Sequence, residues 1–266
     1  YASFYHYQLA KMQIGLKQEK NDAFIFHAAD MNIAELLQAN KPQSRLFPLH
    51  NTEFSKNGVG ISGSHIILRY ADNERILLPS EPETRLPGPH NLLNIMAASA
   101  AASLMNIPAQ SIAEGVATFS PLEHRIEFVG VYRNKYYYND SISTIPEATM
   151  AAITTLHKVN TLILGGFDRG IDYSALIQFL ADKKDIRLVF TGPAGMRMKK
   201  MLDTLSPENA THEMADSFDQ AVNIASQLTP EGGICLLSPA ASSYDSFKNF
   251  EERGRRFKEL VSNKSF

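Results

Sequence analysis

The chain has 266 residues, of which 44% are hydrophobic and 20% charged, and its formal net charge is −2. This composition is typical of a globular protein with one or two domains. With a net charge this close to zero, nothing in the composition points to nucleic acid or to a membrane surface as partner, and no apolar run is long enough to span a bilayer. The single cysteine, Cys235, lies in an apolar run, so we expect a buried strand thiol in a reducing compartment.

The spacing of hydrophobic and polar residues in the first half of the chain predicts three helices, a capped short helix and several strands. The first helix covers 1–16, and because the chain starts within it at a tyrosine, we expect a piece of a longer protein. The remaining elements expected here are helices over 30–39 and 91–105, strands over 23–27 and 45–49, a loosely alternating stretch over 58–70, and its hairpin partner over 75–78.

The end of the first half carries helix-start and helix-stop signals. Ser111 and Glu114 have the spacing of a capping box, which predicts a short helix from Ser111 to Phe119. Pro121 then breaks the chain. We therefore expect a boundary between one domain over 1–120 and a second over 121–266.

Asn91 and Asn94 lie at the start of the alanine-rich helix and on one face of it, because residues three apart are neighbours. Amide groups carry both donors and an acceptor, so two of them can bind the edge of a flat heteroaromatic ring. The alternative is a helix cap with a second, exposed asparagine.

The second half of the chain alternates strands and helices. A hairpin is expected over 126–132 and 135–138, strands over 161–164, 186–191, 211–214 and 234–237, and helices over 173–181, 194–205, 218–228 and 246–261. Continuous apolar strands between helices predict an α/β fold with a doubly wound, mostly parallel sheet. Ligands of such sheets bind where the strands end at their carboxyl edge, and the loops there are 139–145, 165–172, 191–193 and 238–244.

The loop from Asn139 to Ile145 offers Asp140 and three hydroxyl groups before a helix that Pro146 can open. Such a loop suits an anion or a nucleotide. The alternative is that its serine and threonine side chains merely cap the helix.

Two further loops have unusual compositions. Gly165 and Gly166 precede Arg169, and this resembles a loop that binds phosphate or carboxylate, although it is neither a P-loop nor a dinucleotide motif. Small residues from Ser238 to Ser243 precede a helix that contains Gly254, a position at which glycine indicates close packing. The eight histidines have no metal-ligand spacing.

Five motifs occur in a characteristic order: Pro-Gly-Pro-His-Asn-Leu-Leu-Asn, Leu-Glu-His-Arg-Ile-Glu, Asn-Asp-Ser-Ile-Ser-Thr-Ile-Pro-Glu-Ala-Thr, Gly-Gly-Phe-Asp-Arg-Gly and Ser-Pro-Ala-Ala-Ser-Ser-Tyr-Asp-Ser-Phe-Lys-Asn-Phe-Glu-Glu-Arg-Gly. Together they resemble the Mur ligases over essentially the whole chain, and most closely the branch that adds D-glutamate to UDP-N-acetylmuramoyl-L-alanine. The resemblance implies that 1–120 is the later part of the central ATPase domain and that 121–266 is the dinucleotide-fold C-terminal domain, which binds the amino acid. The family's UDP-binding domain, its P-loop, and the Glu and His that hold magnesium in relatives are missing from the sequence.

The resemblance also implies roles for nucleotide-binding residues. Lys11 matches the lysine that is carbamylated in relatives and helps to hold Mg²⁺, and Asn91 and Asn94 match contacts to adenine. Arg125 matches a contact to the ATP phosphates, and Asp140 a contact to the ribose. From the residues alone, Lys11 reads as a solvated lysine and Arg125 as half of a surface ion pair.

Four residues match contacts to D-glutamate: Thr144 and Arg169 with one carboxylate, Ser243 and Phe250 with the other. The chain departs from the family at Ile142, where many relatives carry a lysine. The resemblance thus implies an ATP- and Mg²⁺-dependent ligase of peptidoglycan synthesis that forms an acyl phosphate, acts as a cytoplasmic monomer and closes about a hinge near Pro121. The alternatives are another Mur or folylpolyglutamate-type ligase, or, for this chain alone, an inert nucleotide- or substrate-binding module that cannot hydrolyse ATP.

Overall fold

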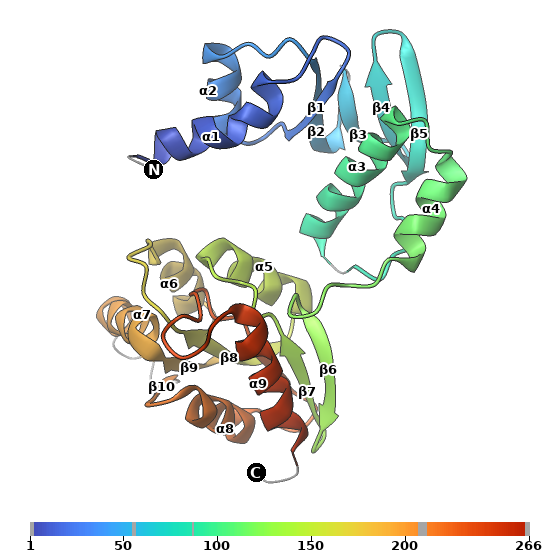
Figure 1. The fold of residues 1–266 in the computed structure, drawn as a ribbon. Helices are drawn as coiled ribbons and strands as arrows, with labels where there is room; N and C mark the ends of the chain where they lie inside the picture. The colour runs from blue at the N-terminus through green and yellow to red at the C-terminus, as the bar shows by residue number, and fades with distance from the viewer. Residues whose placement is uncertain (1–2, 55–56, 87, 207–211, 264–266) are drawn as a thin grey trace. The chain divides into compact units, whose positions relative to one another are not determined.

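The computed structural model describes residues 3–54, 57–86, 88–206 and 212–263. The chain divides into two compact units, Tyr1–Ser120 and Pro121–Phe266. Each unit contains one sheet and its own core (Figure 1). Among the described helices, none is long and apolar enough to cross a bilayer.

The N-terminal unit is built on a five-stranded sheet of order β1-β2-β3-β4-β5. Its strands are β1 (Ala23–His27), β2 (Arg45–Glu53), β3 (Gly58–Ser62), β4 (His65–Tyr70) and β5 (Asn73–Pro79). The stretch 58–70, predicted to alternate as a unit, is itself a hairpin, because Gly63 with φ of +55° permits a tight turn between β3 and β4. The predicted pairing of 75–78 with the strand before it is confirmed, since β4 and β5 run antiparallel.

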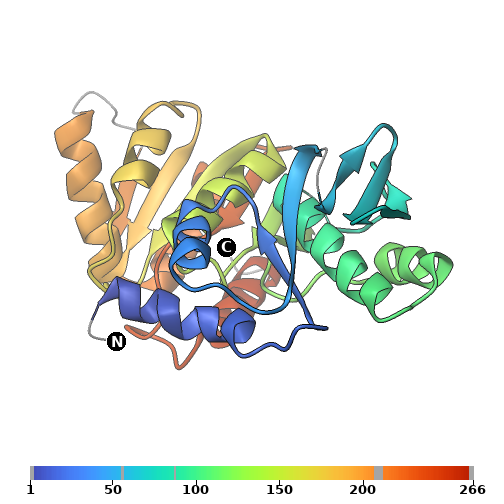
Figure 2. The ribbon, with the colours of Figure 1, turned by 90° about the horizontal axis from the view of Figure 1, so that it is seen from above.

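Four helices cover this sheet: α1 (Phe4–Leu16), α2 (Met31–Ala39), α3 (Pro89–Leu104) and α4 (Ala109–Thr118). Met12 of α1, Phe24 of β1 and Leu36 of α2 form a small cluster that joins the first two helices to the sheet. Figures 1 and 2 show α1 and α2 lying side by side in this unit. The predicted capping box is wrong. Because α4 begins at Ala109 with Pro108 at the cap position, Ser111 lies inside the helix.

The C-terminal unit contains a six-stranded sheet of order β10-β9-β8-β11-β7-β6. Its strands are β6 (Glu127–Tyr132), β7 (Lys135–Asn139), β8 (Val159–Gly165), β9 (Arg187–Thr191), β10 (His212–Ala215) and β11 (Ile234–Leu237). All neighbours pair in parallel except β6, which pairs antiparallel with β7. The prediction of a mostly parallel α/β sheet is confirmed.

Helices pack on both faces of this sheet. They are α5 (Pro146–Leu156), α6 (Ser174–Ala181), α7 (Gly192–Leu205), α8 (Phe218–Leu228) and α9 (Phe250–Ser262). One apolar cluster joins α5, α6 and α7 to the sheet, and a second joins α8 and α9 to the opposite face (Figure 1). Cys235 lies in the second cluster, where burial raises the pKa of its thiol to about 12, so the predicted buried thiol is confirmed.

The last helix begins at Phe250, four residues later than predicted. The carbonyl of Ser243 accepts the N–H groups of Ser246 and Phe247, which forms a turn that keeps this segment out of the helix. Asn249, in extended conformation, then caps α9 by accepting the N–H of Glu252 at 2.8 Å. The loop after β11 is therefore longer than the sequence indicated.

Gly254 lies where α9 packs against the segment before β6. A Cβ atom at this position would lie 2.2 Å from Nδ1 of the buried His124 and 3.0 Å from the amide nitrogen of Asn139. This confirms the close packing expected from a glycine inside a helix. The glycine thus gives up helix propensity so that α9 can approach His124 and Asn139.

Two glycine-to-alanine variants distinguish the effect of close packing from the effect of helix propensity on stability. We expect Gly254→Ala to destabilise the C-terminal unit by about 1–3 kcal/mol, since the new methyl group overlaps side chains that cannot retreat. Gly115→Ala in α4 is the control, because a Cβ there meets nothing within 4 Å, and it should stabilise by up to about 1 kcal/mol. Urea unfolding curves of the whole chain measure both, and equal effects of the two variants would contradict this account of Gly254.

Candidate active site

Four loops of the C-terminal unit meet at the carboxyl edge of the parallel strands, after β7, β8, β9 and β11. Backbone bonds tie the loops after β8 and β11 together: Gly165 N–H donates to the Pro239 carbonyl at 2.8 Å, and Phe167 N–H donates to the Ser242 carbonyl at 2.9 Å. Gly166 permits this contact, since a Cβ there would lie 2.3 Å from the Ser242 carbonyl oxygen and its φ is +135°. The loops after β8 and β11 therefore form one connected surface.

Arg253, which the sequence analysis did not single out, holds this surface from within. The side chain is 2% exposed. Its guanidinium donates four hydrogen bonds, to Ser141 Oγ (3.0 Å), the Ser141 carbonyl (2.8 Å), the Ala241 carbonyl (3.0 Å) and the Ser242 carbonyl (3.2 Å). The hydroxyl of Ser141 in turn donates to the carbonyl of Phe250 at 2.8 Å. One cation thus links the loop after β7, the loop after β11 and the start of α9.

The charge of Arg253 is stabilised by carbonyl dipoles rather than by a carboxylate in direct contact. Burial lowers the pKa of its guanidinium to about 10, and Asp245 opposes that shift. The group is still cationic at neutral pH. A signal for this role was present in the sequence, because Arg253 shares the buried face of α9 with Phe257 and Val261, four and eight residues further on.

Asp140 lies directly after β7 and is also buried, with 1% of its surface exposed. One carboxylate oxygen accepts the N–H of Ile126 at 3.1 Å, and the other accepts the Ser238 hydroxyl at 2.7 Å. Desolvation raises the pKa of Asp140 to about 6, against the lowering effect of hydrogen bonds from Ser143 and Ser238. Because both oxygens have protein donors, a contact to a ligand hydroxyl would exchange one of these bonds.

The hydroxyl groups of this loop do not cap α5, so the capping interpretation is wrong. Ile145 occupies the cap position without a side-chain bond, and Pro146 opens the helix as expected. Ser141 is committed to Arg253 and Phe250 instead. The hydroxyl of Ser141 therefore serves the connection between loops.

A cluster of polar side chains stabilises the start of the loop that follows β7. Asn139, fully buried, donates to His124 Nδ1 at 2.8 Å and to a Glu127 oxygen at 2.9 Å, and Lys258 donates to the other Glu127 oxygen at 2.9 Å. A donor facing Nδ1 selects the neutral imidazole with its proton on Nε2. Burial lowers the pKa of His124, which keeps it neutral.

Arg169 and Thr144, two of the residues matched to D-glutamate, lie together in the structure. The Arg169 guanidinium donates to the Thr144 carbonyl at 2.7 Å while the side chain stays exposed. The loop that carries Arg169 is braced by Arg197, whose guanidinium binds both oxygens of Asp168 at 2.7 Å. Arg169 thus presents an exposed cation on a fixed loop.

Ser243 and Phe250 lie in the loop after β11 and at the first turn of α9. Ser243 is 2% exposed. The Phe250 ring is half-buried and meets the His124 ring edge-to-face at 6.1 Å between centroids. Arg253 fixes this region to the loop after β7 that carries Thr144, so its bonds connect the two predicted D-glutamate contacts.

Arg125 is exposed beside this surface, and its charge is close enough to lower the pKa of Asp140. In the N-terminal unit, Asn91 is buried and Asn94 is exposed, and the Asn94 amide donates to the Asn91 side-chain oxygen at 3.3 Å. The pair therefore shares one helix face, as the spacing predicted.

Lys11 is an exposed residue of α1, and its ammonium lies 5.5 Å from the centre of the Tyr7 ring. An ammonium group has no lone pair for a metal, so it could serve Mg²⁺ only after carbamylation. Within residues 3–54, 57–86, 88–206 and 212–263 no group of three His, Cys, Asp or Glu side chains forms a metal site. These residues alone do not fit a magnesium ion.

Residues 124–241 match the family model "Mur ligase, glutamate ligase domain". The C-terminal unit is therefore a Mur ligase C-terminal domain, which confirms the resemblance seen in the motifs.

Similar proteins extend the comparison to the whole chain. The UDP-N-acetylmuramoylalanine–D-glutamate ligase of Christiangramia forsetii is 34% identical over 97% of this chain and 57% of its own length. The enzyme of that name from Acidobacterium capsulatum is 35% identical over 98% of this chain and 55% of its own length. The chain thus spans little more than half the length of these curated relatives.

A solved structure with the same architecture is the UDP-N-acetylmuramate-alanine ligase of Thermotoga maritima. Its TM-score is 0.61 at 16% identity, over 97% of this chain and 55% of that one. At this identity the similarity shows the fold alone.

The buried acid predicts a pH dependence of stability. The pKa of Asp140 is raised from 3.8 to about 6, so folding favours its protonated form, and its stabilising contribution is present below pH 3.8 and lost as pH rises through 6. Replacing it by Asn should remove this loss. We expect the difference in unfolding free energy between wild type and Asp140→Asn to fall by about 2 kcal/mol from pH 4 to pH 7.

Urea unfolding at several pH values measures this difference, and His124, which acts in the opposite direction below pH 6.5, cancels because both proteins carry it. Asp182→Asn at an exposed position is the control. If the difference in unfolding free energy between wild type and Asp140→Asn varied as little with pH as it does for the control, the raised pKa of Asp140 would be contradicted.

Because Arg253 makes four bonds, the stability of the C-terminal unit should depend on the shape of the cation at this position as well as on its charge. Arg253→Lys keeps the charge but cannot reach both Ser141 and the Ala241–Ser242 segment, so we expect a loss of about 3 kcal/mol in unfolding free energy. Arg255 lies two residues further along the same helix and is exposed. Arg255→Lys is therefore the control, and it should change the free energy of unfolding by less than about 0.5 kcal/mol. Comparable losses in the two variants would refute the linking role of Arg253.

Proposed function

We propose that this chain is part of an ATP-dependent ligase that adds D-glutamate to UDP-N-acetylmuramoyl-L-alanine during peptidoglycan synthesis. The observation that carries the proposal is the placement of the exposed Arg169 guanidinium 2.7 Å from the Thr144 carbonyl, on loops that Arg253 ties to the Ser243 segment. A dicarboxylic amino acid needs two anchoring points with its amine left free. The two sets of residues offer such points.

In the proposed reaction ATP supplies a phosphoryl group that activates the precursor's carboxylate as an acyl phosphate. Arg169 and the Thr144 loop hold one carboxylate of D-glutamate, and Ser243 and Phe250 lie against the other, so that the amine is oriented for attack. Arg125 neutralises phosphate charge. Asn91 and Asn94 bind adenine, and Asp140 contacts the ribose. The proposed ligase is a cytoplasmic monomer that uses Mg²⁺, for which a carbamylated Lys11 would supply one ligand.

Two kinds of relative support nucleotide binding. The MurF ligase of Thermotoga maritima and the folylpolyglutamate synthase of Mycobacterium tuberculosis, which share the fold with TM-scores of 0.62 and 0.61, were solved with ADP. A folylpolyglutamate-type ligase is the second candidate. The names of the curated relatives favour the D-glutamate enzyme.

The experiment that separates these candidates is an amino-acid panel. The full-length protein is incubated with ATP, Mg²⁺ and UDP-N-acetylmuramoyl-L-alanine, and with D-glutamate, L-glutamate, D-aspartate or L-alanine, and phosphate release is measured. D-glutamate should give the highest kcat/KM. Preference for another amino acid would overturn the substrate, and no release with any of them would favour a binding module.

Arg169 is expected to act on the amino acid and not on ATP. Arg169→Ala should raise KM for D-glutamate by about 10- to 100-fold, since a charged hydrogen bond contributes about 1.5–3 kcal/mol, and should leave KM for ATP within about twofold. Lys184→Ala, which removes an exposed cation elsewhere in the same unit, is the control. Equal rises in both KM values for Arg169→Ala would argue against this role.

Ile142 is the departure from the family pattern, and it is half-buried with its N–H donating to the His124 carbonyl at 3.2 Å. We infer that no cation is required at this place. The Ile142→Lys variant tests this inference by measuring KM for D-glutamate. An unchanged or higher KM is expected, and a fall of more than about tenfold, equivalent to 1.4 kcal/mol, would show that a cation is missing there.

A further inference from the structure

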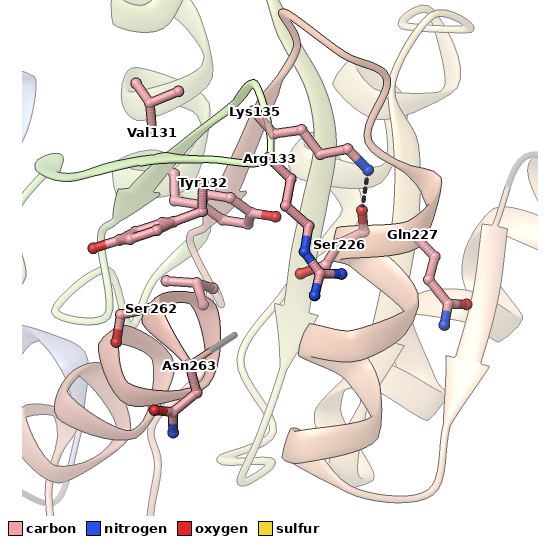
Figure 3. A pocket seen from close by; sticks show the side chains of 10 residues that line it. Val131, Tyr132, Arg133, Lys135, Ser226, Gln227, Ser262 and Asn263 are labelled. Carbon is pink, nitrogen blue, oxygen red and sulfur yellow. Dashed lines mark hydrogen bonds between the residues drawn. The ribbon is translucent and has the colours of Figure 1, made fainter. Parts of the chain in front are cut away.

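Cavities of the C-terminal unit outside the candidate active site differ in whether they reach it. One of about 380 Å³ lies between the β6–β7 hairpin and the ends of α8 and α9, and its lining residue Lys135 donates to the Ser226 carbonyl at 2.6 Å (Figure 3). Because Lys135 is the first residue of β7, this cavity lies at the amino edge of the sheet, away from the site. A groove of about 490 Å³ between α6 and α7 is lined by Arg197, which also binds the loop that carries Arg169. Arg197 therefore connects this groove to the candidate active site.

Arg197 is held to Asp168 by two short bonds. Its Nε donates to one carboxylate oxygen at 2.7 Å, and its Nη2 donates to the other at 2.7 Å and to the Ile171 carbonyl at 2.7 Å. The guanidinium also lies 4.5 Å from the centre of the buried Tyr173 ring. Hydrogen bonds from Arg197 hold the pKa of the Asp168 carboxyl below its ordinary value. The pair is bidentate and partly buried, and these features distinguish it from a mobile surface ion pair.

Asp168 is the residue directly before Arg169, so it carries a negative charge next to the cation proposed for a D-glutamate carboxylate. An unpaired carboxylate at this place would attract the Arg169 guanidinium and repel the carboxylate of a ligand. Among the described residues Arg169 has no ion pair, and its guanidinium donates to the Thr144 carbonyl. The charge of Arg169 thus stays available to a ligand while Asp168 is paired with Arg197.

The second acid of this loop also has donors other than Arg169. One oxygen of Asp172 accepts the N–H of Ser174 at 2.8 Å and its hydroxyl at 2.6 Å. These two bonds lower the pKa of the Asp172 carboxyl. The two acids near Arg169 in the chain, at positions 168 and 172, are therefore both engaged elsewhere.

We propose that Arg197 is a positioning residue for the amino-acid substrate. By pairing with Asp168 it keeps that carboxylate from occupying Arg169, so that Arg169 can bind a carboxylate of D-glutamate with its full charge. Arg197 acts through Asp168 and not on the substrate itself. This role rests on the proposed function, because Arg169 is the cation assigned there to the amino acid.

A double-mutant cycle in the full-length protein tests the proposal. Arg197→Gln frees Asp168 and should raise KM for D-glutamate about 5- to 10-fold, with KM for ATP within about twofold. Adding Asp168→Asn removes the competing charge, while the amide oxygen can still accept the Gly170 N–H, which lies at 2.8 Å in the wild type. KM for D-glutamate should then return to within about threefold of wild type. If Arg197 only braced the loop, the double variant would stay as impaired as Arg197→Gln, and that result would overturn the proposal.

Two further variants separate charge from general loss of structure. Arg197→Lys keeps a cation for Asp168, so its KM for D-glutamate should lie between those of wild type and Arg197→Gln, and a value no lower than that of Arg197→Gln would count against the proposal. Lys200 is an exposed cation three residues further along α7. Lys200→Gln is therefore the matched control, and it should leave both KM values within about twofold. An equal rise of KM for ATP and for D-glutamate in Arg197→Gln would also overturn the proposal.

A crystal structure of the Arg197→Gln variant without substrate decides about Arg197 independently of the proposed function. We expect a carboxylate oxygen of Asp168 within about 4 Å of the Arg169 guanidinium, the distance of an ion pair. An Asp168 carboxylate that stays away from Arg169 would overturn the role of Arg197, whichever amino acid the protein uses. Failure of the wild type to use D-glutamate would instead overturn the proposed function, and the structure of the variant would still be decisive for Arg197.

Discussion

The arrangement of the candidate active site depends on one buried cation. Among the described residues no carboxylate contacts Arg253 directly, and its guanidinium is stabilised by three carbonyl groups and a hydroxyl from two separate loops. A buried charge that lost these partners would be unstable by several kcal/mol. The loops are therefore held in the one arrangement that gives the guanidinium all its hydrogen-bond acceptors. These loops lie at the carboxyl edge of the parallel strands, where α/β proteins bind their ligands, so Arg253 determines the shape of that edge.

The constraint extends through α9 to the other polar groups. Gly254 follows Arg253 and allows the helix to approach His124, and Asn139 joins His124 to Glu127 directly before the loop that begins with Asp140. The residues proposed to contact substrates, such as Arg169, lie on the exposed side of this framework. Such a division suits a ligase, because an ordered polar framework positions reactants without reorganising during the reaction.

The regular parts of the fold were predictable because their signals are local. Continuous apolar strands indicated the parallel sheet, and Gly254 indicated a close approach. The errors also have local causes: Ser111 and Glu114 have capping spacing, but Pro108 starts the helix earlier, and the turn after Ser243 delays α9 to Phe250. The turn after Ser243 is formed by backbone hydrogen bonds, and such bonds cannot be detected from the spacing of hydrophobic residues.

The site was predictable in part, since the motifs named residues that the structure brings together, such as Thr144 and Arg169. The role of Arg253 was not foreseen, because its partners Ser141 and Ala241 are 112 and 12 residues distant. The Ser141 hydroxyl, which the sequence suggested as a helix cap, serves this arginine instead. Contacts between distant loops require the fold, which the sequence pattern does not supply.

The central claim is that the loops joined by Arg253 form the binding surface for the two carboxylates of D-glutamate. The most direct measurement is a crystal structure of the full-length protein with ADP and D-glutamate. We expect one carboxylate within hydrogen-bond distance of the Arg169 guanidinium and the other against the Ser243 segment, with the bonds of Arg253 intact. Density for D-glutamate elsewhere, or at this surface without contact to Arg169, would contradict the account.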